Sequence, residues 1–214
     1  QTYPRGGVSG DKAVSALTAG LTGQSGAGKT TVSRVFAEHG FYVINCDIVA
    51  RKAVEPNSEC AKDLEQKFPQ FFENGVLNRK KAGAALFADK DLLNRYNATI
   101  FPHINKLISQ EIAQAESSGE RYILLDAPTL FEAGADKLCT VIVSCVADTE
   151  KRIERICARD GLSVQACKDR FSSQHSEKFF RERSDYIIEN NGSAEQASTQ
   201  AAEAAEKIKE RANG

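Results

Sequence analysis

Positive charge is not in excess in this sequence, and its absence excludes the commonest kind of nucleic-acid-binding protein. Lys and Arg number 28 against 29 for Asp and Glu, which gives a net charge of −1 at pH 7 and a pI near 6.4. Proteins that grip the phosphate backbone of a nucleic acid need a basic surface. We therefore expect no nucleic-acid partner.

Long hydrophobic runs are missing as well. The longest apolar stretches, such as residues 140–147, are far shorter than the roughly 20 residues that a membrane-spanning helix needs. Residues 1–12 are polar and rich in glycine, without the charged and then apolar pattern of a secretory signal peptide. We expect no membrane partner, a cytoplasmic location, and a loose leader over residues 1–12.

Neither histidine nor cysteine forms a metal-binding or disulfide pattern. The three histidines lie far apart in the sequence. The six cysteines include no CxxC pair, and they are Cys46, Cys60, Cys139, Cys145, Cys157 and Cys167. These spacings argue against a zinc site and against a disulfide framework. We therefore expect reduced thiols that serve packing.

The composition that remains is that of one ordinary globular domain, with 214 residues of which 41% are hydrophobic and 27% charged. A β-branched run over residues 14–22 predicts a buried strand, and residues 42–45 predict a second one. Between them, residues 29–39 have helical spacing and end at Gly40. Strand, helix and strand in about thirty residues indicate a βαβ unit and a parallel sheet.

The rest of the chain supplies further strands and two helical regions. Apolar runs predict strands at residues 121–126, 139–146 and 185–189. Residues 58–118 have a helical pattern throughout and are longer than a simple crossover needs, so we interpret them as an insertion. Asp148 is expected to cap a further helix, short polar helices follow to about residue 183, and an alanine-rich helix is predicted at residues 193–212.

One motif carries specific chemistry. The segment 23–30, GQSGAGKT, matches the phosphate-binding loop GxxxxGK[ST]. Its glycines let backbone N–H groups turn towards phosphate oxygens, and the following helix adds the positive end of its dipole. Lys29 can then reach the β- and γ-phosphates, and the Thr30 hydroxyl can bind Mg²⁺. The predicted ATP-binding residues are Gly23, Ser25, Gly26, Ala27, Gly28, Lys29, Thr30 and Thr31.

Three classes of phosphate-loop protein compete for this sequence: a small-molecule kinase, a GTP-dependent switch and a mechanical ATPase. The only Asn-Lys pair, at residues 105–106, is followed by Leu-Ile and not by the NKxD guanine signature, and no DxxG follows a predicted strand. The strand at residues 121–126 ends in one carboxylate, whereas a motor ATPase has an acidic pair there. The kinase interpretation also explains the helical insertion, which would serve as a platform for the substrate.

Several segments together resemble the dephospho-coenzyme A kinase family over about residues 17–210. The phosphate loop with its flanks is similar to the family's opening segment. Residues 45–51 resemble its Asp-x-Asp-x-x-Ala-Arg element, with Asn45 in place of the first acid. Residues 126–132 resemble its Asp-x-Pro-Leu-Leu-Phe-Glu, with Thr129 interrupting the apolar stretch. Further segments fall where the family has its lid and final strand, at residues 155–160, 170–174 and 185–190.

Two carboxylates follow predicted strands and are candidates for the site. The end of strand 42–45 should emerge beside the phosphate loop, which brings Asp47 close to it. There Asp47 can align the attacking hydroxyl and accept its proton, or it can be the N-cap of a helix that starts at Ile48. The resemblance favours the catalytic role. Asp126 can hold a substrate group, can hold Mg²⁺ through water, or can simply form a turn.

Four arginines are candidates for phosphate binding. Arg51 lies four residues after Asp47, and it either holds substrate phosphate or is solvated. Arg152, Arg155 and Arg159 are spaced i, i+3 and i+7, so they share one helix face. Phosphoryl transfer needs cations over the migrating group, and we expect Arg155 and Arg159 to supply them from a lid. We expect Arg152 to be a solvated surface residue.

These observations predict an α/β fold, a P-loop NTPase of the nucleotide-kinase type with a five-stranded parallel sheet flanked by helices. The expected division is a nucleotide-binding core of residues 13–57, 119–150 and 184–214, a helical substrate region of residues 58–118, and a lid of residues 151–183.

The residues themselves indicate an ATP-dependent phosphotransferase. The resemblance implies that ATP, with Mg²⁺, phosphorylates the ribose 3′-hydroxyl of the small molecule dephospho-coenzyme A. Expected catalytic residues are Lys29, Asp47, Arg155 and Arg159, and expected substrate-binding residues are Asp47, Arg51 and Asp126. Another nucleotide or small-molecule kinase, and a nucleotide-gated switch without acceptor turnover, remain open.

Overall fold

A five-stranded parallel sheet forms the centre of the computed structural model, which describes residues 16–213. The strand order is β2-β5-β1-β6-β7, and all four pairings are parallel. The strands are β1 (Leu17–Gly23), β2 (Tyr42–Asn45), β5 (Tyr122–Asp126), β6 (Val141–Val146) and β7 (Tyr186–Glu189). All five predicted strands are confirmed. The leader and the first residues of the run at 14–22 lie outside the described residues.

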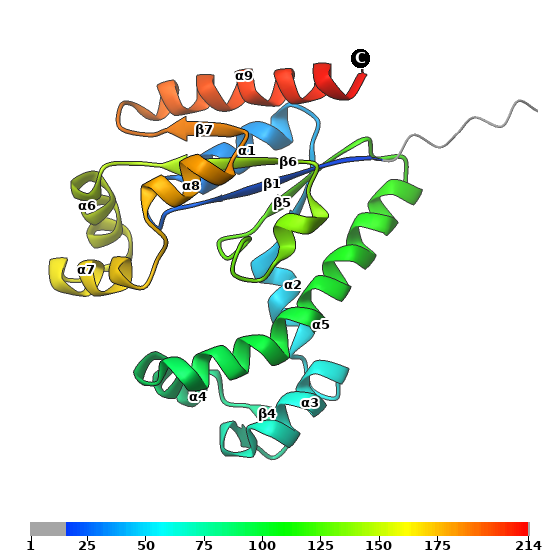
Figure 1. The fold of residues 1–214 in the computed structure, drawn as a ribbon, viewed down its shortest axis with the longest axis vertical. Helices are drawn as coiled ribbons and strands as arrows, with labels where there is room; N and C mark the ends of the chain where they lie inside the picture. The colour runs from blue at the N-terminus through cyan, green and yellow to red at the C-terminus, as the bar shows by residue number, and fades with distance from the viewer. Residues whose placement is uncertain (1–15, 214) are drawn as a thin grey trace, which may run out of the picture.

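Helices cover both faces of this sheet, which is why its central strands are continuously apolar (Figure 1). In β5, residues Ile123, Leu124 and Leu125 are fully buried. Helices α1 (Lys29–Glu38) and α9 (Ala194–Asn213) pack on one face, and α2 (Cys46–Ala53) and α5 (Lys90–Ser117) on the other. The predicted alanine-rich last helix buries an apolar stripe against α1 and the sheet, which consists of Ala197, Ala201, Ala204 and Ile208.

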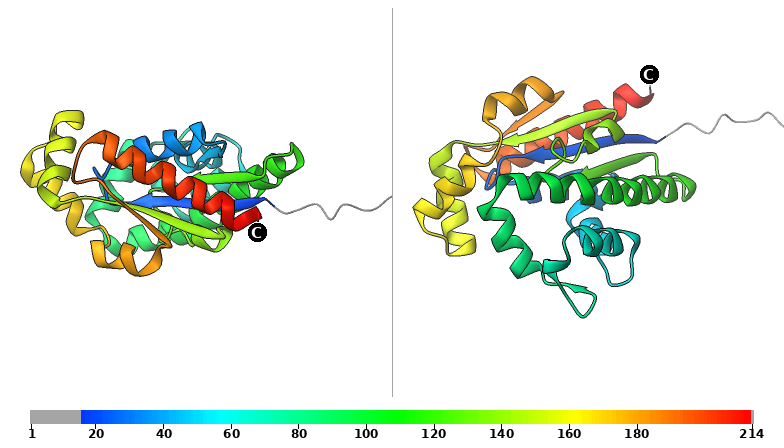
Figure 2. Two further views of the ribbon diagram at one scale, coloured as in Figure 1. Left: turned by 90° about the horizontal axis from the view of Figure 1, so that it is seen from above. Right: turned by 60° about the horizontal axis from the view of Figure 1, so that its bottom comes forward.

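We expected residues 58–118 to be helical throughout, and this prediction is wrong in one part. Besides α3 (Glu59–Lys67), α4 (Arg79–Ala88) and α5, the insertion contains a one-turn helix η1 (Pro69–Phe71) and the two-stranded hairpin of β3 (Phe72–Glu73) and β4 (Val76–Leu77). The Asn-Gly turn between these strands has positive φ at both residues, 53° and 76°, as hairpin turns of this type require. Figure 2 shows this part projecting from the sheet.

Two helices lie at the carboxyl end of the sheet, α6 (Thr149–Asp160) and α7 (Val164–Ser172), and α8 (Glu177–Arg183) then packs against β6 (Figure 1). A further one-turn helix, η2 (Ala135–Leu138), precedes β6. Asp148 occupies the N-cap position of α6 as predicted, but its side chain makes no cap hydrogen bond. Its carboxylate instead accepts a hydrogen bond from Asn191 Nδ2 at 2.9 Å. Within residues 16–213, every helix is too short or too polar to span a membrane.

Candidate active site

The phosphate loop joins β1 to α1, and its backbone takes a shape that glycine permits. Gly23, Gly26 and Gly28 have φ values of +137°, +79° and +97°, which side chains with a Cβ rarely adopt. Neighbouring atoms also leave no room for a Cβ. One on Gly23 would overlap the carbonyl group of Cys145, and one on Gly28 would overlap the side-chain nitrogen of Asn190. Both the conformation and the packing of the loop therefore require glycine.

The first turn of α1 is open to an anion. The helix begins at Lys29 after Gly28, which has no side chain to cap it, and the first turn contains no acidic residue. The Thr30 side chain is exposed and that of Thr31 is half-buried. Backbone N–H groups at the start of a helix, together with the helix dipole, form a ready phosphate site. The loop therefore has the geometry that its sequence predicts.

Lys29 and Asp126 form an ion pair beside this loop. Nζ of Lys29 lies 3.1 Å from Oδ1 of Asp126, and the two side chains are only 19% and 14% exposed. The sheet explains their meeting, because β5 lies between β1 and β2 and places Asp126 level with Leu21 and Asn45. The predicted site residue Asp126 is thus next to the loop, where it holds the lysine amine.

Asp47 is exposed in the first turn of α2, directly beyond the end of β2. The helix begins at Cys46, and its N-cap is Asn45, whose Oδ1 accepts a hydrogen bond from the N–H of Ile48 at 3.1 Å. The alternative interpretation of Asp47 as the helix cap is therefore wrong. A narrow crevice of about 40 Å³ has both Asp47 and Ala127 in its lining, so Asp47 faces the chain that leaves Asp126. Its catalytic role stays a prediction.

Arg51 lies one turn further along α2 and is exposed. Its carbonyl oxygen accepts a hydrogen bond from the guanidinium of Arg79, at the start of α4, at 3.3 Å. This hydrogen bond connects α2, which carries Asp47 and Arg51, with the helical insertion. The position suits a residue that meets the acceptor, and the role of Arg51 stays a prediction.

The three arginines of α6 do not behave alike. Arg152, expected on the surface, is only 4% exposed, and it donates from Nε to the carbonyl oxygen of Ser25 at 2.8 Å. Arg155 donates to the carbonyl oxygen of Gly26 at 3.4 Å. Arg159 is exposed and forms two hydrogen bonds, of 2.6 and 2.8 Å, with the neighbouring Asp160.

The prediction for Arg152 is wrong because i, i+3, i+7 spacing says which residues share a stripe but not what the stripe faces. The buried Ile156 lies one turn after Arg152 and, with it, packs against the loop at Gly26. Arg152 also lies over the ring of Phe171, with its Cζ 3.8 Å from the centroid. Burial lowers the pKa of Arg152, but a guanidinium remains charged at neutral pH.

Other residues around the loop were not singled out from the sequence. Gln24 accepts a hydrogen bond from the N–H of Ala147, and Gln174, after α7, accepts one from the N–H of Ser25 at 3.3 Å. Asn190, after β7, donates to the carbonyl oxygen of Ala27 at 2.8 Å. Gln174 and Asn190 end two of the segments that resemble the family, and this was the one signal in the sequence that could have identified them.

Two cysteines lie near the loop, and both are held as thiols. Burial, together with the carboxylates of Asp126 and Asp47, raises the pKa of Cys46 to about 12. Burial also raises the pKa of Cys145 to about 12, although the nearby Lys29 and Arg155 oppose this shift. Thiolates are the reactive form of cysteine, so neither side chain is a nucleophile at neutral pH.

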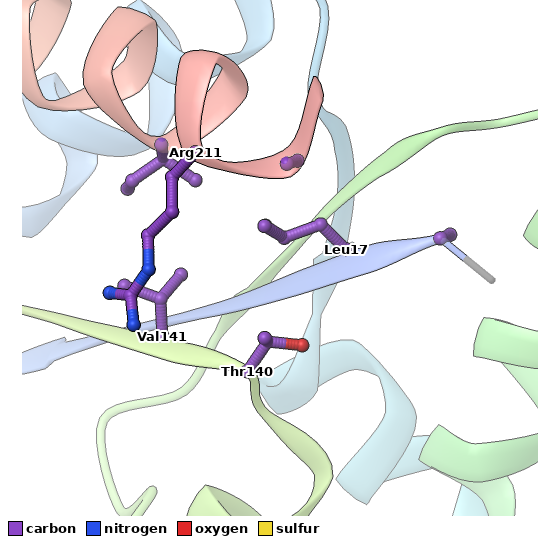
Figure 3. A pocket seen from close by; sticks show the side chains of 7 residues that line it. Leu17, Thr140, Val141 and Arg211 are labelled. Carbon is purple, nitrogen blue, oxygen red and sulfur yellow. The ribbon is translucent and has the colours of Figure 1, made fainter. Parts of the chain in front are cut away.

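A second hollow of about 340 Å³ lies at the opposite end of the sheet (Figure 3). Leu17 and Val141 line it near the amino ends of β1 and β6, and Arg211 reaches over it from α9. Its lining combines aliphatic groups with the Thr140 hydroxyl and one guanidinium, and has no carboxylate or glycine-rich loop. Ligands of parallel α/β sheets bind at the carboxyl ends of the strands, so the phosphate loop remains the candidate site.

Most of the chain is similar to proteins of one known family. The family model for dephospho-CoA kinase matches residues 17–196. A dephospho-CoA kinase from Bacillus licheniformis is 30% identical over 86% of this chain and 92% of its own length. One from Syntrophotalea carbinolica is 34% identical over 86% of this chain and 88% of its own length.

Solved structures share the fold of this chain. A Thermus thermophilus protein with 28% identity superposes with a TM-score of 0.78, covering 90% of this chain and 97% of that one. A dephospho-CoA kinase from Campylobacter jejuni has the same fold, with 23% identity, a TM-score of 0.66, and coverage of 91% and 98%. The family model and the relatives each cover most of the described sheet and its loop, and on these grounds the chain belongs to the dephospho-CoA kinase family.

Proposed function

We propose that this chain transfers the γ-phosphoryl group of ATP to the ribose 3′-hydroxyl of dephospho-coenzyme A, giving coenzyme A and ADP. The observation that carries the proposal is the meeting of three predicted groups at one edge of the sheet. Lys29 of the loop contacts Asp126. Asp47 lines a crevice together with Ala127, the residue that follows Asp126. Membership of the dephospho-CoA kinase family supports the identity of the acceptor.

The loop and Lys29 bind the nucleotide in this mechanism. Backbone N–H groups of residues 23–31 hold the phosphates, and the open first turn of α1 adds its dipole. The Lys29 amine, which Asp126 holds 3.1 Å away, approaches the β- and γ-phosphates. Positive charge fixed in advance at the migrating phosphoryl group stabilises the transition state without reorganisation.

Asp47 acts on the acceptor. Its exposed carboxylate can accept a hydrogen bond from the 3′-hydroxyl, align that oxygen with the γ-phosphorus, and take its proton as the new P–O bond forms. Asn45 already caps α2, so the carboxylate is not needed by the helix and remains available for the hydroxyl. Arg51, one turn away, is suited to an acceptor phosphate.

The metal in this proposal is Mg²⁺, for which the site has fitting donors. The Thr30 hydroxyl is exposed in the first turn of α1, and Asp126 has a second carboxylate oxygen besides the one that holds Lys29. Mg²⁺ typically keeps several waters and uses one or two protein oxygens, so such a sparse set is sufficient. When bound, the ion neutralises charge on the β- and γ-phosphates.

Two helical regions outside the sheet have roles of their own in this proposal. Residues 58–118 form the acceptor platform, and residues 151–183 form a lid over the nucleotide. Arg155, which contacts the loop carbonyl of Gly26, and Arg159 would supply cations from this lid. The six cysteines of the chain are free thiols, which suits the cytoplasmic location that we also propose.

An ADP-release assay with a panel of acceptors tests this function. Dephospho-coenzyme A, AMP, CMP and shikimate are offered separately with ATP and Mg²⁺, and we expect release to be stimulated by dephospho-coenzyme A alone. The Lys29→Ala variant is the control for contaminating kinases, and it should lose at least about a hundredfold in kcat. Stimulation by another acceptor would contradict the proposal, and ADP formation that no acceptor stimulates would indicate a nucleotide-gated switch.

A further inference from the structure

Asn190 connects three parts of the chain that meet at the phosphate loop. It directly follows β7, and its backbone N–H donates to the carbonyl oxygen of Val146 at 2.9 Å, which extends the sheet by one residue. The residue is only 7% exposed, so the partners of its side chain must be protein groups. This burial of an amide side chain next to the loop is not explained by the packing of the apolar core.

Both ends of the Asn190 side chain have a partner of the matching kind. Nδ2 donates to the carbonyl oxygen of Ala27 at 2.8 Å, and Oδ1 accepts from the Arg155 guanidinium at 3.3 Å. The same guanidinium donates to the backbone oxygen of Asn190 at 2.8 Å. If the amide were turned by 180°, Oδ1 would face the Ala27 oxygen and Nδ2 would face the Arg155 guanidinium. The orientation of the amide is therefore fixed by its partners.

The contact with Ala27 determines where the loop's next N–H group points. A trans peptide is planar, and its C=O and N–H point in opposite directions. Holding the Ala27 oxygen towards Asn190 therefore turns the N–H of Gly28 towards the concave side of the loop. The Cys145 thiol also donates to this oxygen, at 2.9 Å, but it is a much weaker donor than an amide.

We infer that Asn190 is a positioning residue for nucleotide binding, which acts through the phosphate loop and Arg155 without touching either substrate. It holds the Ala27 peptide so that the N–H of Gly28 faces the phosphates, and it orients the guanidinium that contacts Gly26. The tight approach at Gly28, where a Cβ would overlap Asn190, belongs to the same arrangement. This inference rests on the proposed function only in taking a nucleotide to be the ligand of the loop.

Two variants and one matched control test the inference. Asn190→Ala removes the donor, and Asn190→Asp keeps the shape but sets a carboxylate against the Ala27 oxygen. Gln200→Ala is the control, because Gln200 also bonds the backbone of β7, at Glu189, but from α9. Equilibrium binding of ADP is measured by calorimetry, and thermal unfolding of each variant shows that it is folded.

We expect both Asn190 variants to raise the Kd for ADP by about fivefold to 150-fold, with Asn190→Asp the weaker binder. This range is the equivalent of about 1–3 kcal/mol for an unsatisfied buried polar group. The KM for ATP should rise in parallel, while the KM for dephospho-coenzyme A stays within about twofold. The control should keep both values within about twofold, although it too loses hydrogen bonds.

A purely structural role would lower thermal stability without this selective loss of nucleotide affinity. If either folded Asn190 variant raises the Kd for ADP by less than about fivefold, or if Gln200→Ala raises it as much, the inference is wrong. Because ADP binding requires no acceptor, the result stands apart from the proposed reaction. A chain that binds ADP but does not phosphorylate dephospho-coenzyme A would refute that function and leave the test of Asn190 intact.

Discussion

Two neighbouring polar side chains at the start of α2 do different work. Asn45 supplies the cap through its contact with the N–H of Ile48, and Asp47 lies in the first turn with its carboxylate exposed. A negative charge there is favourable to the helix dipole but is not required for helix formation. Stability and catalysis can therefore be separated by substituting the two residues one at a time.

Asp47→Asn should lower stability by no more than the small dipole contribution, less than about 1 kcal/mol, and should lower kcat by about 10²–10⁴-fold, because an amide cannot accept the proton. Asn45→Ala should lower the free energy of unfolding by about 1 kcal/mol through loss of the cap. Urea unfolding and initial-rate kinetics with dephospho-coenzyme A measure the two effects. Should Asp47→Asn keep its kcat near that of the wild type, Asp47 has no part in proton transfer.

Arg152 and Arg159 form a second contrasting pair. Arg152→Ala removes hydrogen bonds to Ser25 and Gln174 from a buried position, and we expect the free energy of unfolding to fall by about 1–3 kcal/mol. Arg159→Ala removes an exposed contact with Asp160 and should change it by less than about 0.5 kcal/mol. Equal effects of the two substitutions in urea unfolding would contradict this assignment of burial.

Among single residues, those constrained by their own backbone could be predicted from sequence. The loop glycines, Lys29 and the carboxylate that ends β5 lie where the motif and the strand pattern put them. Arg152 could not be predicted correctly, because its environment comes from Ser25 and Phe171, which are distant in sequence. The same holds for Asn190, whose partner Ala27 is 163 residues away in the sequence.

Among the elements, α6 and the end of α7 rest directly on the phosphate loop. Arg155 reaches the loop from α6, and Gln174 reaches it from just after α7. These hydrogen bonds give a change in the loop on phosphate binding a direct route to both helices. This gives the proposed lid a physical connection to the nucleotide.

Hydrogen exchange with and without ligand tests this connection. We expect the amides of residues 150–183 to exchange rapidly in the free protein and to be protected when ADP and dephospho-coenzyme A are bound. Helix α9, which packs against α1 and the sheet and lies outside the proposed lid, is the internal control and should be unaffected. Identical exchange in residues 150–183 with and without ligands would show that these helices are ordinary surface structure.

The hairpin of β3 and β4 shows where element prediction from sequence fails. Each strand has only two residues, too few to show a period of two, so the sequence pattern does not reveal them. The aromatic contacts of Phe68 with Phe71 and Tyr96 pack this part against α5. Tertiary packing, which the sequence pattern does not display, therefore determines the local structure here.

At the scale of the whole molecule, the sheet could be predicted almost completely. Its strands are apolar on both faces, and parallel strands require crossovers, which the helical segments supply. The sequence alone did not give the strand order or the face that each helix covers. Those follow from long-range pairings such as Ala19 with Leu124 and with Val141.

Buried thiols make the stability of the whole protein sensitive to alkaline pH. Burial raises the pKa values of Cys46, Cys139 and Cys145 to about 12, whereas an unfolded thiol has a pKa of about 8.5. The unfolded chain therefore loses these protons first, and the free energy of unfolding is retained below about pH 8.5 and falls as the pH rises towards 12.

Cys139→Ala should reduce this alkaline dependence, because it removes one of the three thiols and lies away from the phosphate loop. Urea unfolding of both proteins at about pH 8 and pH 10 measures the difference. The wild type should lose more stability over this interval, by up to about 1.4 kcal/mol per pH unit for one thiol. Parallel losses in the two proteins would mean that Cys139 ionises as freely in the folded state as in the unfolded one.

Phosphorus NMR of the reaction product tests the proposed function most directly. The protein is incubated with ATP, Mg²⁺ and dephospho-coenzyme A, and the spectrum is followed alongside that of Lys29→Ala. We expect ADP to form together with one new phosphomonoester coupled to the ribose 3′-hydrogen, and neither to form with the variant. Phosphate attached at another position, or ADP with free phosphate and unchanged dephospho-coenzyme A, would contradict the proposed reaction.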